Sequence, residues 1–204
     1  MTKKRFNVTR PVPFFKNKRK RAKMKKPEIL KKIKKMSIFE YMLYSAIILA
    51  GIAVDQLTKF LAVKFLEPVG SVPIIKDVLH LTFYTNPGAA WGSFADRRYI
   101  FMSISTVMII GLSLYLFSGL AENKKYGISF SLIISGGIGN MIDRIFVGEV
   151  VDFIDFTLIN FPIFNGADSL VCIGAALLVL LLIIDIVNES KKGEKKRKDK
   201  GELT

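Results

Sequence analysis

The chain has 204 residues, half of them hydrophobic, yet its formal net charge is +14. The positive charge lies at the two ends, because residues 1–36 carry +15, residues 188–204 carry +3 and residues 37–187 carry −4. This placement argues against a nucleic-acid-binding globule, which presents its basic residues on a folded face. The single cysteine excludes an internal disulfide, and with one histidine the chain lacks ligands for a His/Cys zinc site. A serine or cysteine triad would have to use that one histidine, His80.

Four apolar segments follow one another along the chain, at about residues 37–60, 99–120, 127–142 and 169–184. Helices of this length cross about the thickness of a bilayer core, although the third and fourth segments need their flanks to do so. A bundle of buried helices in a soluble protein is the alternative. The fourth segment argues against it, because it is apolar on every side and has no polar face. The sequence therefore predicts an α-helical membrane protein with four transmembrane helices.

The distribution of lysine and arginine predicts the orientation of these helices. With four spans, both ends of the chain lie on one side of the membrane together with the loop at 121–126, and most of the basic residues are there. The positive-inside rule places that side in the cytoplasm, so loops 61–98 and 147–167 face outward. The first segment is too long for a cleaved signal peptide, and Asp55 and Gln56 follow where a small-residue cleavage site would stand.

The outward loops contain residue patterns that are typical of short strands. Residues 78–85 alternate apolar and polar side chains, as a half-buried strand does, and Asn86, Pro87 and Gly88 then turn the chain. Residues 150–156 are a second strand candidate. We expect a small extracytoplasmic β-sheet that caps the outer ends of the helices.

The chain thus divides into three parts: a basic cytoplasmic arm at 1–36, partly disordered, a four-helix membrane domain at 37–187 and a basic cytoplasmic tail at 188–204. Within the arm, residues 27–36 place apolar side chains on one stripe between lysines. That pattern fits a helix lying on an anionic inner leaflet, and equally a solvated signal for membrane orientation.

Five carboxylates are expected to converge on the outer surface: Asp55, Asp143, Asp152, Asp155 and Asp168. Ionisable residues close to a membrane favour a functional site. The alternative is that they cluster by chance where the helix ends meet water. Peptide hydrolysis without a serine or cysteine nucleophile or a metal would need two carboxylates that share a proton and activate water.

From the residues alone, Asp143 and Asp155 compete with Asp152 as the partner of Asp168. Asp143 precedes Arg144 and has the features of a structural ion-pair member. Asp155 is an odd number of residues from Asp152, so in a strand the two lie on opposite faces. Asp152 therefore ranks only slightly ahead.

Five short motifs appear at the outer helix ends and in the outer loops: DQLTK at 55–59, NPGAAWG at 86–92, GNMIDR at 139–144, VVDF at 150–153 and FNGAD at 164–168. In this order and topology they closely resemble lipoprotein signal peptidase, or signal peptidase II, a bacterial membrane aspartyl peptidase family. The resemblance covers about residues 38–187. Trp91 stands where the family usually has Phe, and the long basic arm exceeds the family's short lead-in.

The resemblance implies an aspartyl endopeptidase that removes the signal peptide from a prolipoprotein, just before a cysteine that already carries diacylglycerol. It places the catalytic pair at Asp152 and Asp168. It also implies a multi-pass protein of the bacterial cytoplasmic membrane, with its active site near the outer face. The expected partners are the diacylglyceryl-prolipoprotein and membrane lipids, without nucleic acid, metal or cofactor, and the enzyme is expected to be a monomer.

Supporting roles follow from the same resemblance. Residues expected to orient the catalytic pair or the substrate are Asn140, Arg144 and Asn165, and those expected to contact the peptide are Asn86 and Gly88. Support residues near the site are Asp55, Lys59 and Asp143, the first two as an i,i+4 pair. His80 is expected to be a polar strand residue, and Cys172 a core or lipid-facing residue.

Two rival functions remain. A Ser-Lys peptidase would use Ser93 with Lys59 and would depend on that lysine. A small transporter or channel would relay ions through its carboxylates, but it would hold them near the middle of the membrane and not at its outer edge.

Overall fold

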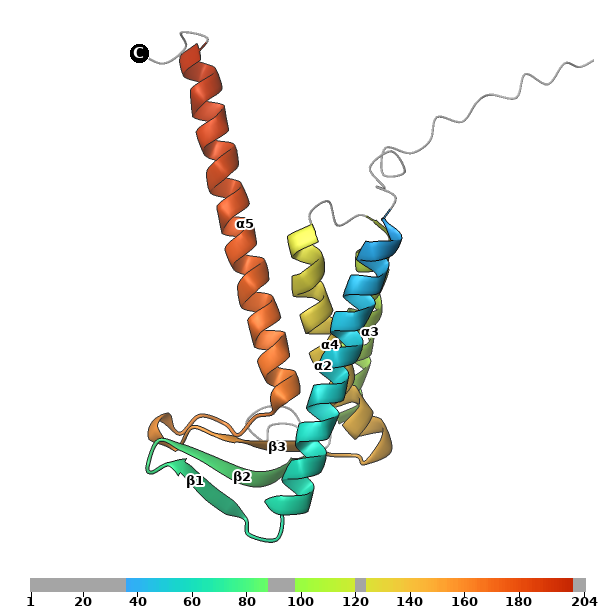
Figure 1. Ribbon diagram of the computed structural model, residues 1–204, viewed down its shortest axis with the longest axis vertical. Coiled ribbons are helices and arrows are strands. Elements are labelled where there is room, and N and C mark those ends of the chain that lie inside the picture. Colours follow the sequence, from blue (N-terminus) through green and yellow to red (C-terminus); the bar gives the residue numbers. More distant parts are fainter. Residues whose placement is uncertain (1–35, 88–97, 120–123, 200–204) are drawn as a thin grey trace, which may run out of the picture. The chain divides into compact units, whose positions relative to one another are not determined.

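The computed structural model describes residues 36–87, 98–119 and 124–199. They form four helices and a small sheet in the order α2 (Ile38–Phe65), β1 (Ser71–Ile75), β2 (Leu79–Asn86), α3 (Arg98–Phe117), α4 (Lys124–Phe146), β3 (Val150–Asp155), the 3₁₀ turn η3 (Thr157–Ile159) and α5 (Gly166–Asp199) (Figure 1). The helix considered over 27–36 lies outside the described residues, as does Gly88.

Helix α2 begins where its sequence supplies a cap. The Ser37 side chain accepts the backbone N–H of Glu40, and the Glu40 carboxylate accepts the backbone N–H of Ser37 at 2.8 Å. This reciprocal capping box satisfies two N–H groups that the first helical turn would otherwise leave unpaired. Glu40 also forms an ion pair with Lys124 at 3.3 Å, which joins the starts of α2 and α4.

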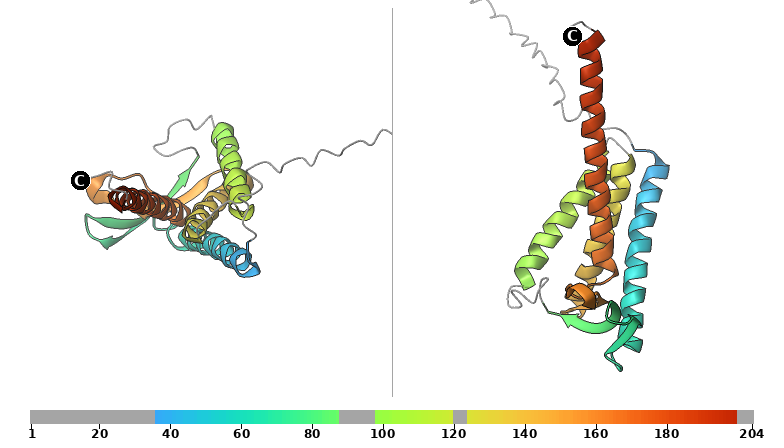
Figure 2. Two further views of the ribbon diagram at one scale, coloured as in Figure 1. Left: turned by 90° about the horizontal axis from the view of Figure 1, so that it is seen from above. Right: turned by 90° about the vertical axis from the view of Figure 1, so that its left-hand side faces the viewer.

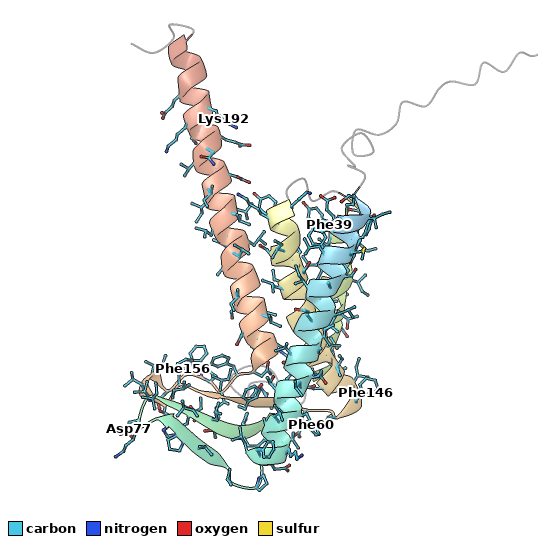
Figure 3. The ribbon with its side chains drawn as sticks, viewed as in Figure 1. Phe39, Phe60, Asp77, Phe146, Phe156 and Lys192 are labelled. Carbon is cyan, nitrogen blue, oxygen red and sulfur yellow. The ribbon has the colours of Figure 1, made fainter. Side chains whose placement is uncertain are left out.

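Two described helices, α2 and the segment Gly166–Glu194 of α5, are long and apolar enough to cross a membrane, and α3 contributes the shorter apolar segment Met102–Phe117. Large apolar side chains project outward from these helices, as Phe39 and Phe60 do in Figure 3. Exposed apolar surface on this scale suits a lipid environment. The prediction of a mostly helical membrane protein is confirmed, and a spanning role for α3 and α4 remains a prediction.

Helix α4 is the central helix and packs against α5, α2 and α3. Helix α3 is inclined relative to α2 and α4 (Figure 2). Most of the buried residues of α4 are small or polar, including Ser131, Ser135 and Gly136, with Ile134 and Met141 as the apolar exceptions. Small residues allow neighbouring helices to approach closely, which is the usual basis of helix packing in membranes. Because α4 contacts protein on most sides, it is less apolar than its neighbours.

Helix α5 is longer than the fourth predicted apolar segment. It begins at Gly166 and continues to Asp199, so residues 188–199 of the expected tail are helical. About halfway along α5, Asp185 accepts a hydrogen bond from the Tyr126 hydroxyl of α4.

The sheet confirms both predicted strands and adds a third. The strands are antiparallel in the order β1-β2-β3, with Tyr84 opposite Asp152 and Asn86 opposite Val150. Sequence reasoning missed β1, which contains Pro73. Proline cannot donate a hydrogen bond to a neighbouring strand, so its presence argues against a strand. It is nevertheless tolerated on an edge strand such as β1.

The sheet lies across the end of the helices where α2 finishes and α5 begins (Figure 1). Ala62 and Leu66 of α2 form a buried apolar cluster with Val151 of β3. Backbone hydrogen bonds between Ile154 and Phe164 then tie β3 to the segment that leads into α5. These contacts bring the middle of β3 next to the first turn of α5.

Close packing of α4 on α5 gives a stability prediction. A Cβ atom at Gly136 would collide with the carbonyl oxygen of Ala167, whereas one at Gly111 of α3 would meet nothing within 4 Å. We expect Gly136→Ala to cost about 1–3 kcal/mol through overpacking, and Gly111→Ala to be neutral or slightly stabilising. Thermal unfolding of the two variants in the same detergent compares them, and equal unfolding temperatures would contradict the packing described.

Candidate active site

The first turn of α5 is held by a second capping box. The Asn165 side-chain oxygen accepts the backbone N–H of Asp168 at 3.0 Å, and the Asp168 carboxylate accepts the backbone N–H of Asn165 at 3.3 Å. The Asp55 carboxylate of α2 accepts the backbone N–H of Ala167 at 2.8 Å. Since the N-terminal amides of a helix otherwise lack partners, these contacts stabilise the turn and fix the position of Asp168.

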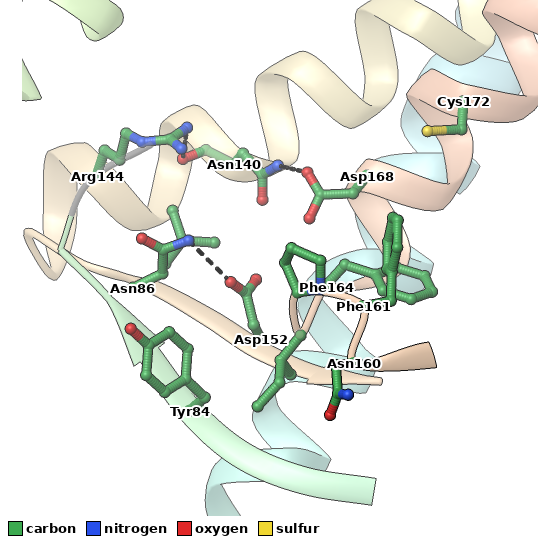
Figure 4. A pocket seen from close by; sticks show the side chains of 13 residues that line it. Tyr84, Asn86, Asn140, Arg144, Asp152, Asn160, Phe161, Phe164, Asp168 and Cys172 are labelled. Carbon is green, nitrogen blue, oxygen red and sulfur yellow. Dashed lines mark hydrogen bonds between the residues drawn. The ribbon is translucent and has the colours of Figure 1, made fainter. Parts of the chain in front are cut away.

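Strand β3 brings Asp152 to the same place. Its side chain is buried, with 2% of the residue exposed. Asn165 donates to one carboxylate oxygen at 2.6 Å, and Asn86 of β2 donates to the other at 3.1 Å (Figure 4). Asn165 therefore donates to both carboxylates, to that of Asp168 through its backbone N–H and to that of Asp152 through its side-chain amide.

Asn140 connects this pair to α4. Its amide nitrogen donates to Asp168 at 2.7 Å, and its side-chain oxygen accepts from Asn165 at 3.0 Å and from Lys59 at 2.9 Å. The Arg144 guanidinium, one turn further on, donates to the backbone oxygen of Asn140 at 3.3 Å. Four elements, α2, α4, β3 and the start of α5, thus contribute to one continuous polar network.

Behind the pair lies a buried charge cluster. The Lys59 ammonium contacts Asp55 at 2.9 Å and Asp143 at 2.8 Å, and Gln56 donates to the second Asp143 oxygen at 2.9 Å. The expected i,i+4 pair of Asp55 and Lys59 is confirmed, and Asp143 is an ion-pair member with Lys59 as its partner. With Asn140, the Lys59 ammonium contacts three side-chain oxygens, and an ammonium group has no acceptor with which to activate a serine. Ser93, its partner in the rival mechanism, lies outside the described residues.

Asp155 faces away from this network. It accepts the Thr82 hydroxyl at 2.9 Å, and Thr82 in turn contacts Ser71 of β1 at 2.8 Å. The odd separation in the strand has the predicted effect, because Asp152 contacts the start of α5 and Asp155 contacts Thr82 on the central strand β2.

A pocket of about 570 Å³ opens over the two carboxylates. Polar side chains line one part of it: Asn86, Asn140, Arg144, Asp152 and Asp168. Asn165 lies beneath the pair, and Asp55, Lys59 and Asp143 form the layer behind it. Other lining residues were not predicted: Tyr84, Val150, Asn160, Phe161, Pro162, Ile163, Phe164 and Cys172.

From the sequence, Cys172 is expected to be a core or a lipid-facing residue. It is exposed and lines the pocket, so the first of these alternatives is wrong. It follows Asp168 by four positions on α5, a spacing that puts both on one helix face and that the sequence already contained. The apolar run at 161–164 carried no comparable signal, because its place beside the pocket depends on the bridge between Phe164 and β3.

Burial raises the pKa of Asp152 from its ordinary 3.8 to about 6. The negative charge of Asp168 acts in the same direction, whereas the N–H donors of Asn86 and Asn165 and the positive charge of Lys59 oppose the rise. A carboxyl with this pKa retains a proton at mildly acidic pH, while ordinary carboxyls have lost theirs.

Comparison with known proteins gives one consistent family. Residues 47–184 match the family model described as "Signal peptidase (SPase) II". The "Lipoprotein signal peptidase" of Brevibacillus brevis (strain 47) is 44% identical over 145 residues, 71% of this chain and 95% of the relative. That of Bacillus subtilis (strain 168) is 42% identical over 153 residues, 74% of this chain and 99% of the relative.

Solved structures agree with this result. Two structures described as a bacterial membrane enzyme, obtained by the in meso method, are similar to this chain. One has a TM-score of 0.66 and 34% identity and covers 72% of this chain and 90% of the other. The second has a TM-score of 0.63 and 33% identity and covers 74% and 96%.

The raised pKa of Asp152 predicts an unusual pH dependence of stability. The folded state binds this proton more tightly than the unfolded state, so the protein loses stability as the pH rises from about 4 to about 6. A rise of about two pKa units corresponds to about 3 kcal/mol. Asp152→Asn is expected to remove this loss and to raise the unfolding temperature at pH 8 by about 5 °C.

The control for this measurement is Asp155→Asn on the same strand. It leaves Asp152 in place and is expected to keep the loss of stability between pH 4 and 6. An Asp152→Asn protein that unfolds at a lower temperature than the parent at pH 8 would contradict the burial of a charged carboxyl at this position.

Proposed function

The chain belongs to the signal peptidase II family and is an aspartic endopeptidase that removes signal peptides from prolipoproteins, and we propose that Asp152 and Asp168 are its catalytic pair. One observation carries the assignment: Asn165 binds both carboxylates at the base of a single pocket. Asp55 and Asp143, by contrast, are neutralised by Lys59 behind that pocket.

The two carboxyls differ in a way that suggests their roles. Asp152 is buried and keeps a proton up to a pH of about 6. Asp168 lies in the first turn of α5, where the helix dipole and the N–H donors of Asn140 and Asn165 favour negative charge on a ligand or side chain. We therefore assign Asp152 as the acid and Asp168 as the base.

The reaction then needs one water molecule. As its oxygen attacks the carbonyl carbon of the scissile peptide, the water gives a proton to Asp168, and Asp152 donates its proton to the carbonyl oxygen. The resulting diol collapses when Asp168 protonates the leaving nitrogen and the C–N bond breaks. One hydroxyl of the diol returns its proton to Asp152 as the new carboxylic acid forms. Both carboxyls end in their starting states.

Other pocket residues are proposed to hold the substrate. Asn86 and Arg144 present N–H groups on two sides of the pair, where they suit peptide carbonyl oxygens. Phe161 and Phe164 supply an apolar wall, which suits the side chains of a signal peptide. Gly88 is proposed to contact the peptide from the segment that follows β2.

The membrane arrangement is a proposal at finer detail. We propose that α3 and α4 span the membrane beside α2 and α5, with the arm at 1–36 and the tail at 188–204 in the cytoplasm and the sheet at the outer face of the bacterial cytoplasmic membrane. Support comes from the basic residues at both ends of the chain and from the sheet at the opposite end of the helices. The enzyme is further proposed to act as a monomer surrounded by membrane lipids, which suit the apolar side chains exposed on its helices.

The catalytic pair is tested by neutralising each carboxyl. Asp152→Asn and Asp168→Asn are each expected to lower cleavage of a prolipoprotein by at least about 10³-fold, because a single carboxyl supplies only the acid or only the base. The matched control is Asp155→Asn, whose side chain is bound to Thr82 away from the pocket. Cleavage by either pair variant at more than a tenth of the parent rate would remove that residue from the assignment.

Lipid on the substrate provides a separate test. We propose that the cysteine after the scissile bond carries diacylglycerol, whose chains hold the peptide at the membrane surface, since each buried CH₂ contributes about 0.8 kcal/mol. The unmodified prolipoprotein is expected to have a kcat/KM lower by at least about 10²-fold, from lost positioning. Equal rates on the two substrates in detergent would instead indicate a peptidase that reads only the peptide.

A further inference from the structure

A single side chain, that of Asn140, stands between Lys59 and the proposed catalytic pair, and within the described part of the chain Lys59 forms no hydrogen bond or ion pair with either carboxylate. Its ammonium group is buried, with 3% of the residue exposed, and it contacts Asp55, Asp143 and the side-chain oxygen of Asn140. Salt bridging alone would need only the carboxylates. The third contact, to a neutral amide that itself binds Asp168, is the one that points beyond a structural role.

The amide of Asn140 can be placed in two ways that differ by a half-turn. In one, its NH₂ group faces Asp168, and in the other its oxygen does. Lys59 has only donors, so its contact at 2.9 Å requires the oxygen on its own side. Asn165 donates to the same oxygen at 3.0 Å. The NH₂ group is then left to donate to Asp168, at 2.7 Å.

We propose that Lys59 is a positioning residue for catalysis, which holds the Asn140 amide in the one orientation that donates a hydrogen bond to Asp168. This inference rests on the proposed catalytic pair. The same ammonium also forms an ion pair with Asp55, whose carboxylate accepts the backbone N–H of Ala167, two residues after Asn165. Lys59 thus connects α2 both to the side chain that contacts Asp168 and to the helical turn that carries it.

The charge of Lys59 has a second effect that can be measured. Charged and titratable groups approach Asp152 from every side: Lys59 from α2, Arg144 from α4, Asp168 from α5 and Tyr84 from β2. The positive charge of Lys59 lowers the pKa of Asp152, against the larger effect of burial. Removal of Lys59 therefore raises this pKa further, and the acid form of Asp152 persists to higher pH.

The test compares Lys59→Met with Lys64→Met, a lysine of the same helix that is exposed and contacts only the ring of Phe65 among the interactions found for the described residues. Lys59→Met leaves Asp55 and Asp143 as buried charges without a cation, which endangers folding. A double variant that adds Asp143→Asn keeps the net charge of the cluster unchanged. Folding of each protein is followed by thermal unfolding in detergent, and cleavage of the prolipoprotein is measured from pH 5 to pH 9.

For the folded double variant we expect kcat to fall by about 10²-fold, with KM changed by less than about threefold. For the folded single variant Lys59→Met, which removes the positive charge alone, we also expect the alkaline limb of the kcat/KM profile to move to higher pH. Lys64→Met is expected to match the parent in all three. Lys59→Arg is expected to recover part of kcat, because arginine also has only donors.

Three results would overturn the proposal: an unchanged kcat in the folded double variant, a pH profile of the folded single variant that coincides with that of the parent, or failure of both Lys59→Met proteins to fold, which would make Lys59 a residue of the fold and no more. None of these affects the catalytic pair. Asp152→Asn and Asp168→Asn test that assignment in the same assay, and their full activity would instead remove the proposed function on which this inference depends.

Discussion

The hydrogen bonds of Asn165 are the constraint on which the site depends. One side chain caps helix α5, donates to Asp152 and donates to Asn140. An aspartate could cap the helix but has no donor, whereas asparagine has an oxygen that accepts the helix amide and an NH₂ group that donates to two further side chains. The start of α5 and the position of the catalytic pair are therefore set by the same residue.

The bundle behind the pair explains how such a polar network exists beside apolar helices. Buried polar groups are costly unless each finds a partner. Here Lys59 forms ion pairs with Asp55 and Asp143, Gln56 donates to Asp143, and Asn140 accepts from Lys59. Glycines on α4 bring α2 and α5 close enough for these short side chains to meet; at Gly139 even a Cβ atom would press on the Asp55 carboxylate.

Burial also separates the two carboxyls chemically. Asp152 belongs to a strand that packs on α2, and its burial there raises its pKa. Asp168 occupies the first turn of a helix, where amides converge on it. Two identical side chains thus receive different environments from a strand and a helix end, and an acid and a base are what the hydrolysis of a peptide requires. The same burial destabilises the folded protein at neutral pH, as is common for functional sites.

The sequence by itself determined the elements. Apolar length predicts the helices, alternation predicts β2 and β3, and the five motifs name the site residues, because these signals are local and each occupies a short stretch of chain. Only the tertiary structure decided which aspartates lie together. The residues alone rank Asp152 only slightly ahead of Asp143, and what separates them in space is that Lys59 pairs with Asp143 while Asn165 joins Asp152 to Asp168. The apolar wall at 161–164 borders the pocket for the same reason, because the bridge between Phe164 and β3 joins residues by packing, which no local pattern records.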